Sequence, residues 1–212
     1  MNLELQIVDE TLSNKEFKEL IQEIESLQIS KISVLPCHIS FLKKNLKSSC
    51  KISSLIDFPF GVMSTNERAL VVNNSIKNGA SSIDILCPSY MVVNRSYTYL
   101  KKDIEKIYEL CVSKKVDLSY ILEYRSFTYD SLYKLSKILL ASGIKNIYIS
   151  TGYKIDDIYD HLIAMAMIQK NVPEMHIIPN CNIFNTRHKN MLEMAEIDHI
   201  RVNSINSAKL FK

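Results

Sequence analysis

Short apolar runs alternate with longer segments of helical periodicity along almost the whole chain, and this alternation constrains the fold more than any other feature. Most of the short runs are continuously apolar, which is typical of parallel strands that are covered on both faces. Parallel strands also need crossover connections, which the longer segments supply. We predict strands near Leu3–Val8, Ile32–Leu35, Ile52–Ile56, Ser82–Leu86, Ser119–Glu123, Asn146–Ser150, Met175–Pro179 and His199–Asn203.

The segments between the predicted strands carry clear helix signals. Ser13 with Glu16, and Ser64 with Glu67, form capping-box patterns that precede apolar residues at helical spacing. Apolar stripes of the same spacing run through Leu100–Cys111, Leu132–Leu139 and Ile158–Ala166.

Eight strand–helix units favour a closed (β/α)8 TIM barrel, an α/β fold, over an open sheet. A chain of 212 residues is short for this fold, for which about 250 residues are typical. The shortfall lies at the end, where only Ser204–Lys212 follow the last predicted strand. We predict one barrel domain over residues 1–212 whose eighth outer helix is truncated or absent. A protein partner or a second copy of the chain would cover the wall left exposed.

The charge balance does not point to a polyanionic partner. The chain has 26 basic and 23 acidic residues and a net charge of +3, without a basic block. We therefore expect no nucleic-acid and no membrane-surface binding. No apolar run approaches the roughly 20 residues of a membrane span. The five cysteines are scattered and form no CxxC pair, which favours reduced thiols and a cytoplasmic location.

Two carboxylates stand where a barrel would bury them. Asp84 and Glu123 lie within apolar strand segments and should face the barrel interior, where an unpaired charge is costly. One interpretation is acid–base catalysis or ligand binding near the strand ends, where barrel enzymes place their chemistry. The other is a structural carboxylate paired with a neighbour such as Arg125 or Arg201. The sequence favours neither interpretation.

A series of short motifs stands at or near the predicted strand ends. They are Asp9 with Thr11, Leu35-Pro36, Phe58-Pro59-Phe60-Gly61, Gly79-Ala80 before Ile83-Asp84, Ile121-Leu122-Glu123 and Ser150-Thr151-Gly152. Each motif is weak alone, but their order and spacing over nearly the whole chain resemble the deoxyribose-phosphate aldolase family.

The resemblance implies a reversible class I aldol cleavage of 2-deoxyribose 5-phosphate, in which a lysine forms an imine with the aldehyde. It implies proton transfer by Asp84 and a contact between Asp9 and a substrate hydroxyl group. Ser150, Thr151 and Gly152 would form the turn that contacts a small phosphorylated or anionic ligand. It implies no cofactor and no metal.

The resemblance also places both family lysines at positions that hold other residues. Tyr148 stands at the imine-forming position and Ile178 at the supporting position. Cys181, Asn182, Arg201 and Ile205 stand where glycines would form the phosphate site, although Arg201 could contact an anion directly. The nearby Lys145 and Lys154 should lie outside the barrel interior.

Two main hypotheses follow from these departures. In the first, the barrel has lost imine chemistry and serves as a binding or assembly subunit. In the second, it is an active aldolase or lyase that uses a relocated lysine or an acid–base cluster of Asp9, Asp84, Glu123 and Tyr148. The relocated-lysine version requires a lysine ammonium group within hydrogen-bond reach of Asp84. A metal hydrolase with His38 near Asp9 or Asp57 is a poorer third hypothesis, because the histidines lack ligand spacing.

Overall fold

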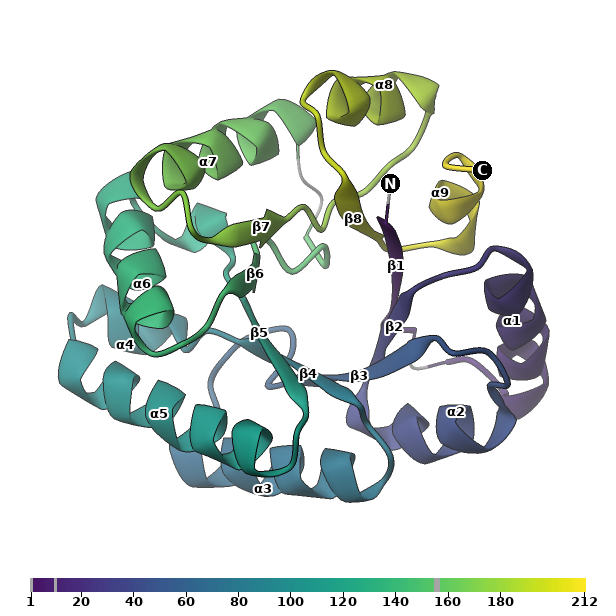
Figure 1. Ribbon diagram of the computed structural model, residues 1–212, viewed down its shortest axis with the longest axis horizontal. Coiled ribbons are helices and arrows are strands. Elements are labelled where there is room, and N and C mark those ends of the chain that lie inside the picture. Colours follow the sequence, from purple (N-terminus) through teal and green to yellow (C-terminus); the bar gives the residue numbers. More distant parts are fainter. Residues whose placement is uncertain (1, 10, 155–156) are drawn as a thin grey trace.

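All eight strands of the sheet are parallel and follow one another around a nearly closed barrel (Figure 1). The computed structural model describes residues 2–9, 11–154 and 157–212. Neighbouring strands pair in the order β7-β6-β5-β4-β3-β2-β1-β8, and an isolated bridge between Asn180 and Arg201 joins the two ends of the sheet. The predicted TIM barrel is confirmed. The strands are β1 Asn2–Ile7, β2 Lys31–Val34, β3 Lys51–Ile56, β4 Ser82–Leu86, β5 Asp117–Ile121, β6 Asn146–Tyr148, β7 His176–Ile178 and β8 His199–Val202.

Helices surround the strands as an outer ring (Figure 1). Both predicted capping boxes are present, because Ser13 and Ser64 each accept a backbone N–H bond at the start of α1 and α3. The helices are α1 Asn14–Ser26, α2 Ile39–Asn45, α3 Thr65–Lys77, α4 Ser89–Val93, α5 Tyr97–Ser113, α6 Tyr129–Ala141, α7 Ile158–Asn171, α8 Thr186–Met194 and α9 Ile205–Lys209, with short 3-10 turns at Pro36–His38 and Tyr124–Ser126.

The last helix is truncated, as the sequence predicts. α9 has 5 residues and packs against α1, β1 and β8. A cavity of about 380 Å³ remains beside it, with walls from β1, α1 and α9 that include Leu5, Leu20 and Ile205. The outer wall is therefore thin where the barrel closes.

The first two strands differ from the predicted continuous apolar pattern. In β1, Leu3, Leu5 and Ile7 belong to the main hydrophobic core, whereas Glu4 and Gln6 alternate with them and are also buried. Lys31 and Ser33 in β2 are likewise buried polar residues. Successive strand side chains point to opposite faces, so the polar residues face the barrel interior. These two strands are exceptions to the continuously apolar pattern of most strands, because the amino-terminal part of the barrel interior is polar.

Strands β6 and β7 are shorter than predicted, and side-chain hydrogen bonds join the two segments just beyond the strand ends. Ser150 Oγ donates to the Asn180 carbonyl at 2.9 Å, and Asn180 Nδ2 donates to the Ser150 carbonyl at 3.2 Å. Pro179 also lacks a backbone N–H. The chain therefore leaves the regular ladder after Tyr148 and Ile178.

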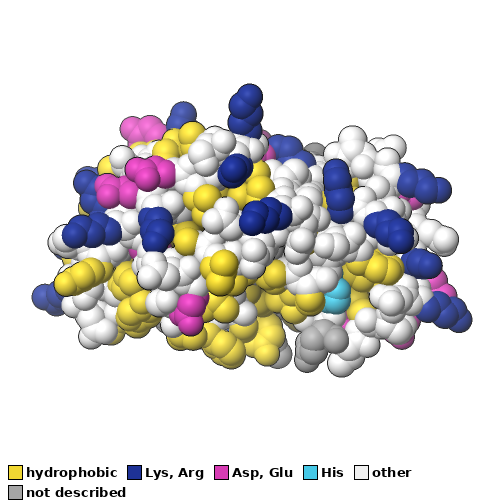
Figure 2. All heavy atoms as spheres, turned by 90° about the horizontal axis from the view of Figure 1, so that it is seen from below, with side chains coloured by type: hydrophobic (Ala, Val, Ile, Leu, Met, Phe, Trp, Pro, Cys, Tyr) yellow, Lys and Arg dark blue, Asp and Glu magenta, His cyan; other side chains and the backbone are white. Residues whose placement is uncertain are grey.

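The surface in Figure 2 carries Lys and Arg side chains spread over the face rather than gathered in one block. Hydrophobic side chains gather along its lower edge, on the far side of the view in Figure 1. Across the described residues, no helix combines the length and apolar character needed to cross a membrane.

The capping box of α3 offers a test of the local fold. Replacing Ser64 by alanine removes the side chain that accepts the Glu67 N–H and should lower the free energy of unfolding by about 1 kcal/mol. Urea denaturation measures this change. Ser113→Ala, which removes a bond from a hydroxyl group to the carbonyl of Leu110 within α5, is the control and should cost less. Equal losses in both variants would contradict the capping assignment.

Candidate functional site

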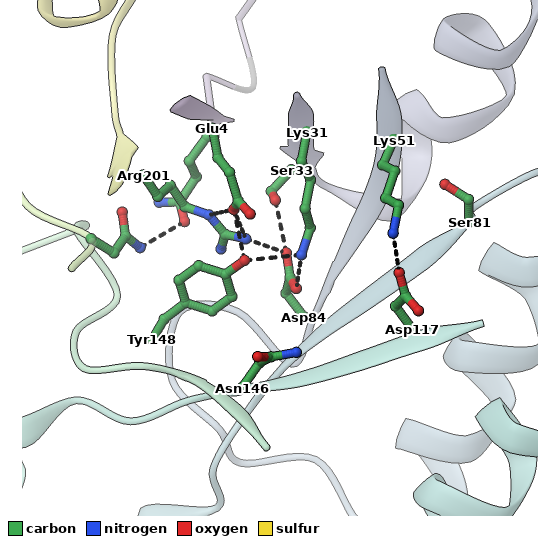
Figure 3. A network of polar contacts seen from close by, with 12 residues as sticks. Glu4, Lys31, Ser33, Lys51, Ser81, Asp84, Asp117, Asn146, Tyr148 and Arg201 are labelled. Carbon is green, nitrogen blue, oxygen red and sulfur yellow. Dashed lines mark hydrogen bonds and ion pairs between the residues drawn. The ribbon is translucent and has the colours of Figure 1, made fainter. Parts of the chain in front are cut away.

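A buried network of charged and polar side chains fills the centre of the barrel (Figure 3). Its members come from five different strands and meet because each occupies an inward-facing position. They are Glu4 of β1, Lys31 and Ser33 of β2, Asp84 of β4, Tyr148 of β6 and Arg201 of β8.

Asp84 is the best-satisfied carboxylate of the network. It is fully buried and accepts bonds from Lys31 Nζ at 2.8 Å, Ser33 Oγ at 2.7 Å and Arg201 Nη2 at 2.6 Å. Burial alone would raise its pKa, but the charges of Arg201 and Lys31 outweigh burial and hold the pKa of Asp84 below its usual range. Asp84 is therefore an ionised carboxylate with a pairing cation on two sides.

Glu4 holds the other side of the network. Its carboxylate accepts bonds from Arg201 Nε at 3.1 Å and Nη2 at 2.9 Å, from the Tyr148 hydroxyl group at 2.6 Å, and lies 2.8 Å from His199 Nε2. Burial would raise the pKa of Glu4, yet the charges of Lys31 and Arg201 and these hydrogen bonds lower it. Glu4 and Asp84 thus share the Arg201 guanidinium group.

Tyr148 is locked by three neighbours. Its hydroxyl group donates to Glu4 and accepts from Lys31 Nζ at 2.9 Å. The Arg201 guanidinium carbon lies 3.4 Å from the ring centroid, a cation–π contact. Burial, followed by the carboxylates of Asp84 and Glu4, raises the pKa of Tyr148 well above its ordinary value. The phenol is protonated and already donating, so it is poorly placed to act as a base.

Lys31 and Glu4 are members of the network that the sequence-based prediction missed. The signal was present as polar–apolar alternation, since Lys31 precedes Ser33 by two residues and Glu4 precedes Gln6 by two. A lysine in the first position of a strand is normally solvated, which hid its role. Lys31 supplies the ammonium group within hydrogen-bond reach of Asp84 that the relocated-lysine hypothesis requires.

A hydrophobic layer follows the charged network toward the carboxyl ends of the strands. Its five buried members are each 2% exposed or less, and Val8 and Phe58 pack against them. Tyr148 belongs to both the layer and the network, because its ring lies in the layer while its hydroxyl group points to Glu4. The layer consists of Leu55, Leu86, Ile121, Tyr148 and Ile178.

The predicted substrate-binding turn is buried and internally bonded. Gly152 N–H donates to Ser150 Oγ at 3.0 Å, and Thr151 Oγ1 donates to Glu123 Oε2 at 2.6 Å. A Cβ atom at Gly152 would lie 2.5 Å from Asn203 Nδ2 and 2.8 Å from Asn180 Oδ1. Two asparagine side chains therefore occupy the space beside the glycine, and a carboxylate stands next to the threonine.

The four predicted catalytic residues lie in three separate environments. Asp84 and Tyr148 share the central network through Lys31. Glu123 binds Thr151 and pairs with Arg125 at 3.2 Å in the loop after β5. Asp9 is exposed after β1 and accepts bonds from the Thr11 side chain and backbone. Arg201, one of the predicted substrate-binding residues, forms ion pairs with Glu4 and Asp84 inside the barrel.

No group of three or more His, Cys, Asp or Glu side chains is placed to hold a metal ion in the described part of the chain. His38 packs edge-on against Phe17, with ring centroids 5.0 Å apart, and Asp57 pairs with Arg68. The geometry therefore gives the metal-hydrolase hypothesis no support.

The central network makes stability depend on pH. Glu4 and Asp84 have folded-state pKa values below their ordinary values of 4.5 and 3.8. Such groups stabilise the fold above the unfolded-state pKa, and that stabilisation is lost as the pH falls. Urea denaturation should therefore show a free energy of unfolding that decreases as the pH is lowered through about 5 to 3.

Glu4→Gln should show a shallower decrease, because it removes one of the two titrating groups from the network. Glu109→Gln, a change on the exposed face of α5, is the matched control and should keep the steep decrease. A Glu4→Gln profile as steep as that of the unchanged protein would contradict the assignment.

Comparison with known proteins places this barrel among aldolases. No protein-family model matches the chain. It is 30% identical over 152 residues to the deoxyribose-phosphate aldolase of Mycoplasmopsis pulmonis, covering 69% of this chain and 68% of that protein. The solved structure "QR15, an Aldolase" superposes with a TM-score of 0.87 at 20% identity, covering 99% of this chain and 94% of that one.

A second solved structure is the tetrameric deoxyribose phosphate aldolase of Aeropyrum pernix. It superposes with a TM-score of 0.84 at 16% identity and covers 99% of this chain and 89% of that one. The solved structures show the fold, and the sequence match to the Mycoplasmopsis protein shows the ancestry. The chain belongs to the deoxyribose-phosphate aldolase family.

Proposed function

We propose that this family member has no class I aldolase activity and acts as a binding or assembly subunit. The observation that carries the proposal is the buried hydrophobic layer formed by strands β3 to β7, which includes both Tyr148 and Ile178. These are the positions at which the family resemblance places the imine-forming and supporting lysines. A phenol and an alkyl group can neither form an imine nor supply its electron sink.

The position of Asp84 supports the same proposal. An aspartate that transfers protons must exchange them with a substrate, yet every oxygen of Asp84 is bonded within the network. The hydrophobic layer lies nearer than Asp84 to the carboxyl ends of strands β3 to β7, and barrel enzymes bind their substrates at those ends. Asp84 therefore acts as the structural carboxylate of one sequence-based interpretation, with Arg201 as its partner.

The turn at Ser150–Gly152 is a poor phosphate site. A phosphate nest needs free N–H donors and close backbone approach. Here the Gly152 N–H is bonded to Ser150, and Asn180 and Asn203 fill the adjoining space. Glu123 would also repel a phosphate group.

An assembly role is supported by the surface at the carboxyl ends of the strands. Phe60, Val62, Tyr153 and Phe184 follow β3, β6 and β7 and are each more than half exposed. Exposed apolar groups of this kind favour association. The cavity beside the short helix α9 is lined mainly by apolar residues, and we propose that a further chain covers one or both surfaces.

The aldolase activity can be tested directly. The purified chain, incubated with acetaldehyde or deoxyribose 5-phosphate and then with sodium borohydride, should show no mass increase and no turnover. The Mycoplasmopsis pulmonis relative serves as the positive control. A stoichiometric adduct on any lysine, or turnover at the rate of that relative, would contradict the proposal.

A second candidate function rests on Lys31, whose ammonium group lies 2.8 Å from Asp84 and 2.9 Å from the Tyr148 hydroxyl group. In this candidate, Lys31 Nζ attacks an aldehyde carbon, forms an imine and releases water, and Asp84 assists proton transfer. The geometry favours it less, because Asp84 and the Tyr148 hydroxyl group hold Lys31 Nζ inside the buried network, away from the carboxyl ends of the strands where barrel enzymes bind their substrates.

Peptide mapping after borohydride treatment separates the two candidates. The second candidate predicts an adduct on Lys31 that Lys31→Met abolishes. Lys51→Met is the matched control. Lys51 and Lys31 are both the first residue of a strand and line one cavity at the amino-terminal end of the barrel, but Lys51 pairs with Asp117. This variant should leave the adduct intact. An unmodified Lys31 would rule the second candidate out.

A further inference from the structure

The barrel has an open cavity at the end opposite to the usual active site. Its volume is about 240 Å³, and its wall includes the first residue of every one of the eight strands. These eight residues are Asn2, Lys31, Lys51, Ser82, Asp117, Asn146, His176 and His199. The cavity therefore opens at the amino-terminal end of the barrel, below the central network.

We propose that this cavity binds a small neutral polyhydroxy compound, such as a polyol or a free monosaccharide. The inference deepens the proposed binding role and rests on it. The ligand would enter at the amino ends of the strands. The hydrophobic layer, which lies toward the carboxyl ends of the strands, would not obstruct it.

The charges that line the cavity are already paired. Lys31 pairs with Asp84, Lys51 with Asp117 and Glu4 with Arg201. A charged ligand would have to give up its hydration without finding a free counter-charge among these groups. A neutral ligand avoids that penalty, so the electrostatics favour an uncharged polar molecule.

The wall also offers hydrogen-bonding groups of both kinds. Ser82 is a lining residue of the cavity, and its buried Oγ has no hydrogen-bond partner among the described residues. Ser119 adds a second hydroxyl group to the wall, and Asn146 adds a side-chain amide whose Oδ1 lies 3.0 Å from His176 Nδ1. Hydroxyl and amide groups both donate and accept, which matches the alternating demands of ligand hydroxyl groups.

The size and floor of the cavity fit the same class of ligand. A volume of 240 Å³ corresponds to about eight water molecules at ~30 Å³ each. Ile178 contributes an apolar surface to the lining, against which the C–H groups of a polyol can pack. A long or bulky ligand would extend beyond the cavity.

The test is an amide NMR titration of the full chain with xylitol and D-ribose, with inorganic phosphate as the anionic probe. The neutral probes should give saturable shifts at Lys31, Ser82, Ser119 and Asn146, which line the cavity. They should leave the amides of Thr151 and Gly152 unchanged. Absence of saturable shifts, shifts centred on Thr151 and Gly152, or saturation with phosphate alone would overturn the proposal.

Two variants locate the site. Ser82→Ala removes the unpartnered hydroxyl group and should weaken binding roughly fivefold, while Ser119→Leu should fill the cavity and abolish binding. Ser136→Ala is the matched control. The Ser136 hydroxyl group is also buried and has no hydrogen-bond partner among the described residues, but Ser136 lies on α6. Equal affinity in Ser82→Ala and Ser136→Ala would overturn the assignment even if Ser119→Leu fails to fold.

Failure of this inference is distinguishable from failure of the proposed function. Borohydride trapping on a lysine would overturn the proposed loss of aldolase activity, whatever the NMR titration shows. An absence of polyol binding together with an absence of trapping would overturn the cavity assignment alone and leave assembly as the proposed role.

Discussion

The ion pairs around Asp84 determine what the interior of this barrel can hold. Two carboxylates and two cations are buried together, and such charges are tolerated only when each is paired and hydrogen-bonded. Arg201 satisfies both Glu4 and Asp84, and its guanidinium group also covers the Tyr148 ring. The position of Tyr148 follows from these contacts, and the ring in turn completes the hydrophobic layer.

This arrangement divides the barrel into two ends with different chemistry. Toward the carboxyl ends of the strands, a buried hydrophobic layer includes Tyr148 and Ile178, and the Ser150–Gly152 turn bonds to its own neighbours. Toward the amino ends, polar residues line an open cavity. The family fold is kept, while this polar cavity lies at the opposite end of the barrel from the usual active site.

Much of the fold followed from the sequence because apolar periodicity reports which faces are buried. The capping serines at Ser13 and Ser64 and the truncated last helix were predictable for local reasons. Lys31 was not predicted as part of the site, because β2 spans only 4 residues. So short an alternation does not reveal which strand face turns toward the barrel axis.

Only part of the candidate site could be predicted from the sequence. Asp84 was predicted to face the barrel interior and lies in the central network, whereas Asp9 and Glu123 belong to other local networks. Which side chains meet depends on strand register and barrel stagger, such as the pairing of Glu4 with both Lys31 and Arg201. Sequence spacing alone carries no information about those distant partners.

The proposed loss of aldolase activity requires that the barrel does not admit an aldolase substrate from the carboxyl ends of its strands. A crystal of the chain soaked in deoxyribose 5-phosphate gives the decisive observation. We expect Tyr148 still to donate to Glu4, the hydrophobic layer to be intact, and no sugar phosphate to lie at the Ser150–Gly152 turn. Electron density for a sugar phosphate at that turn, with its carbon chain beside Asp84, would show that the interior is open to this substrate.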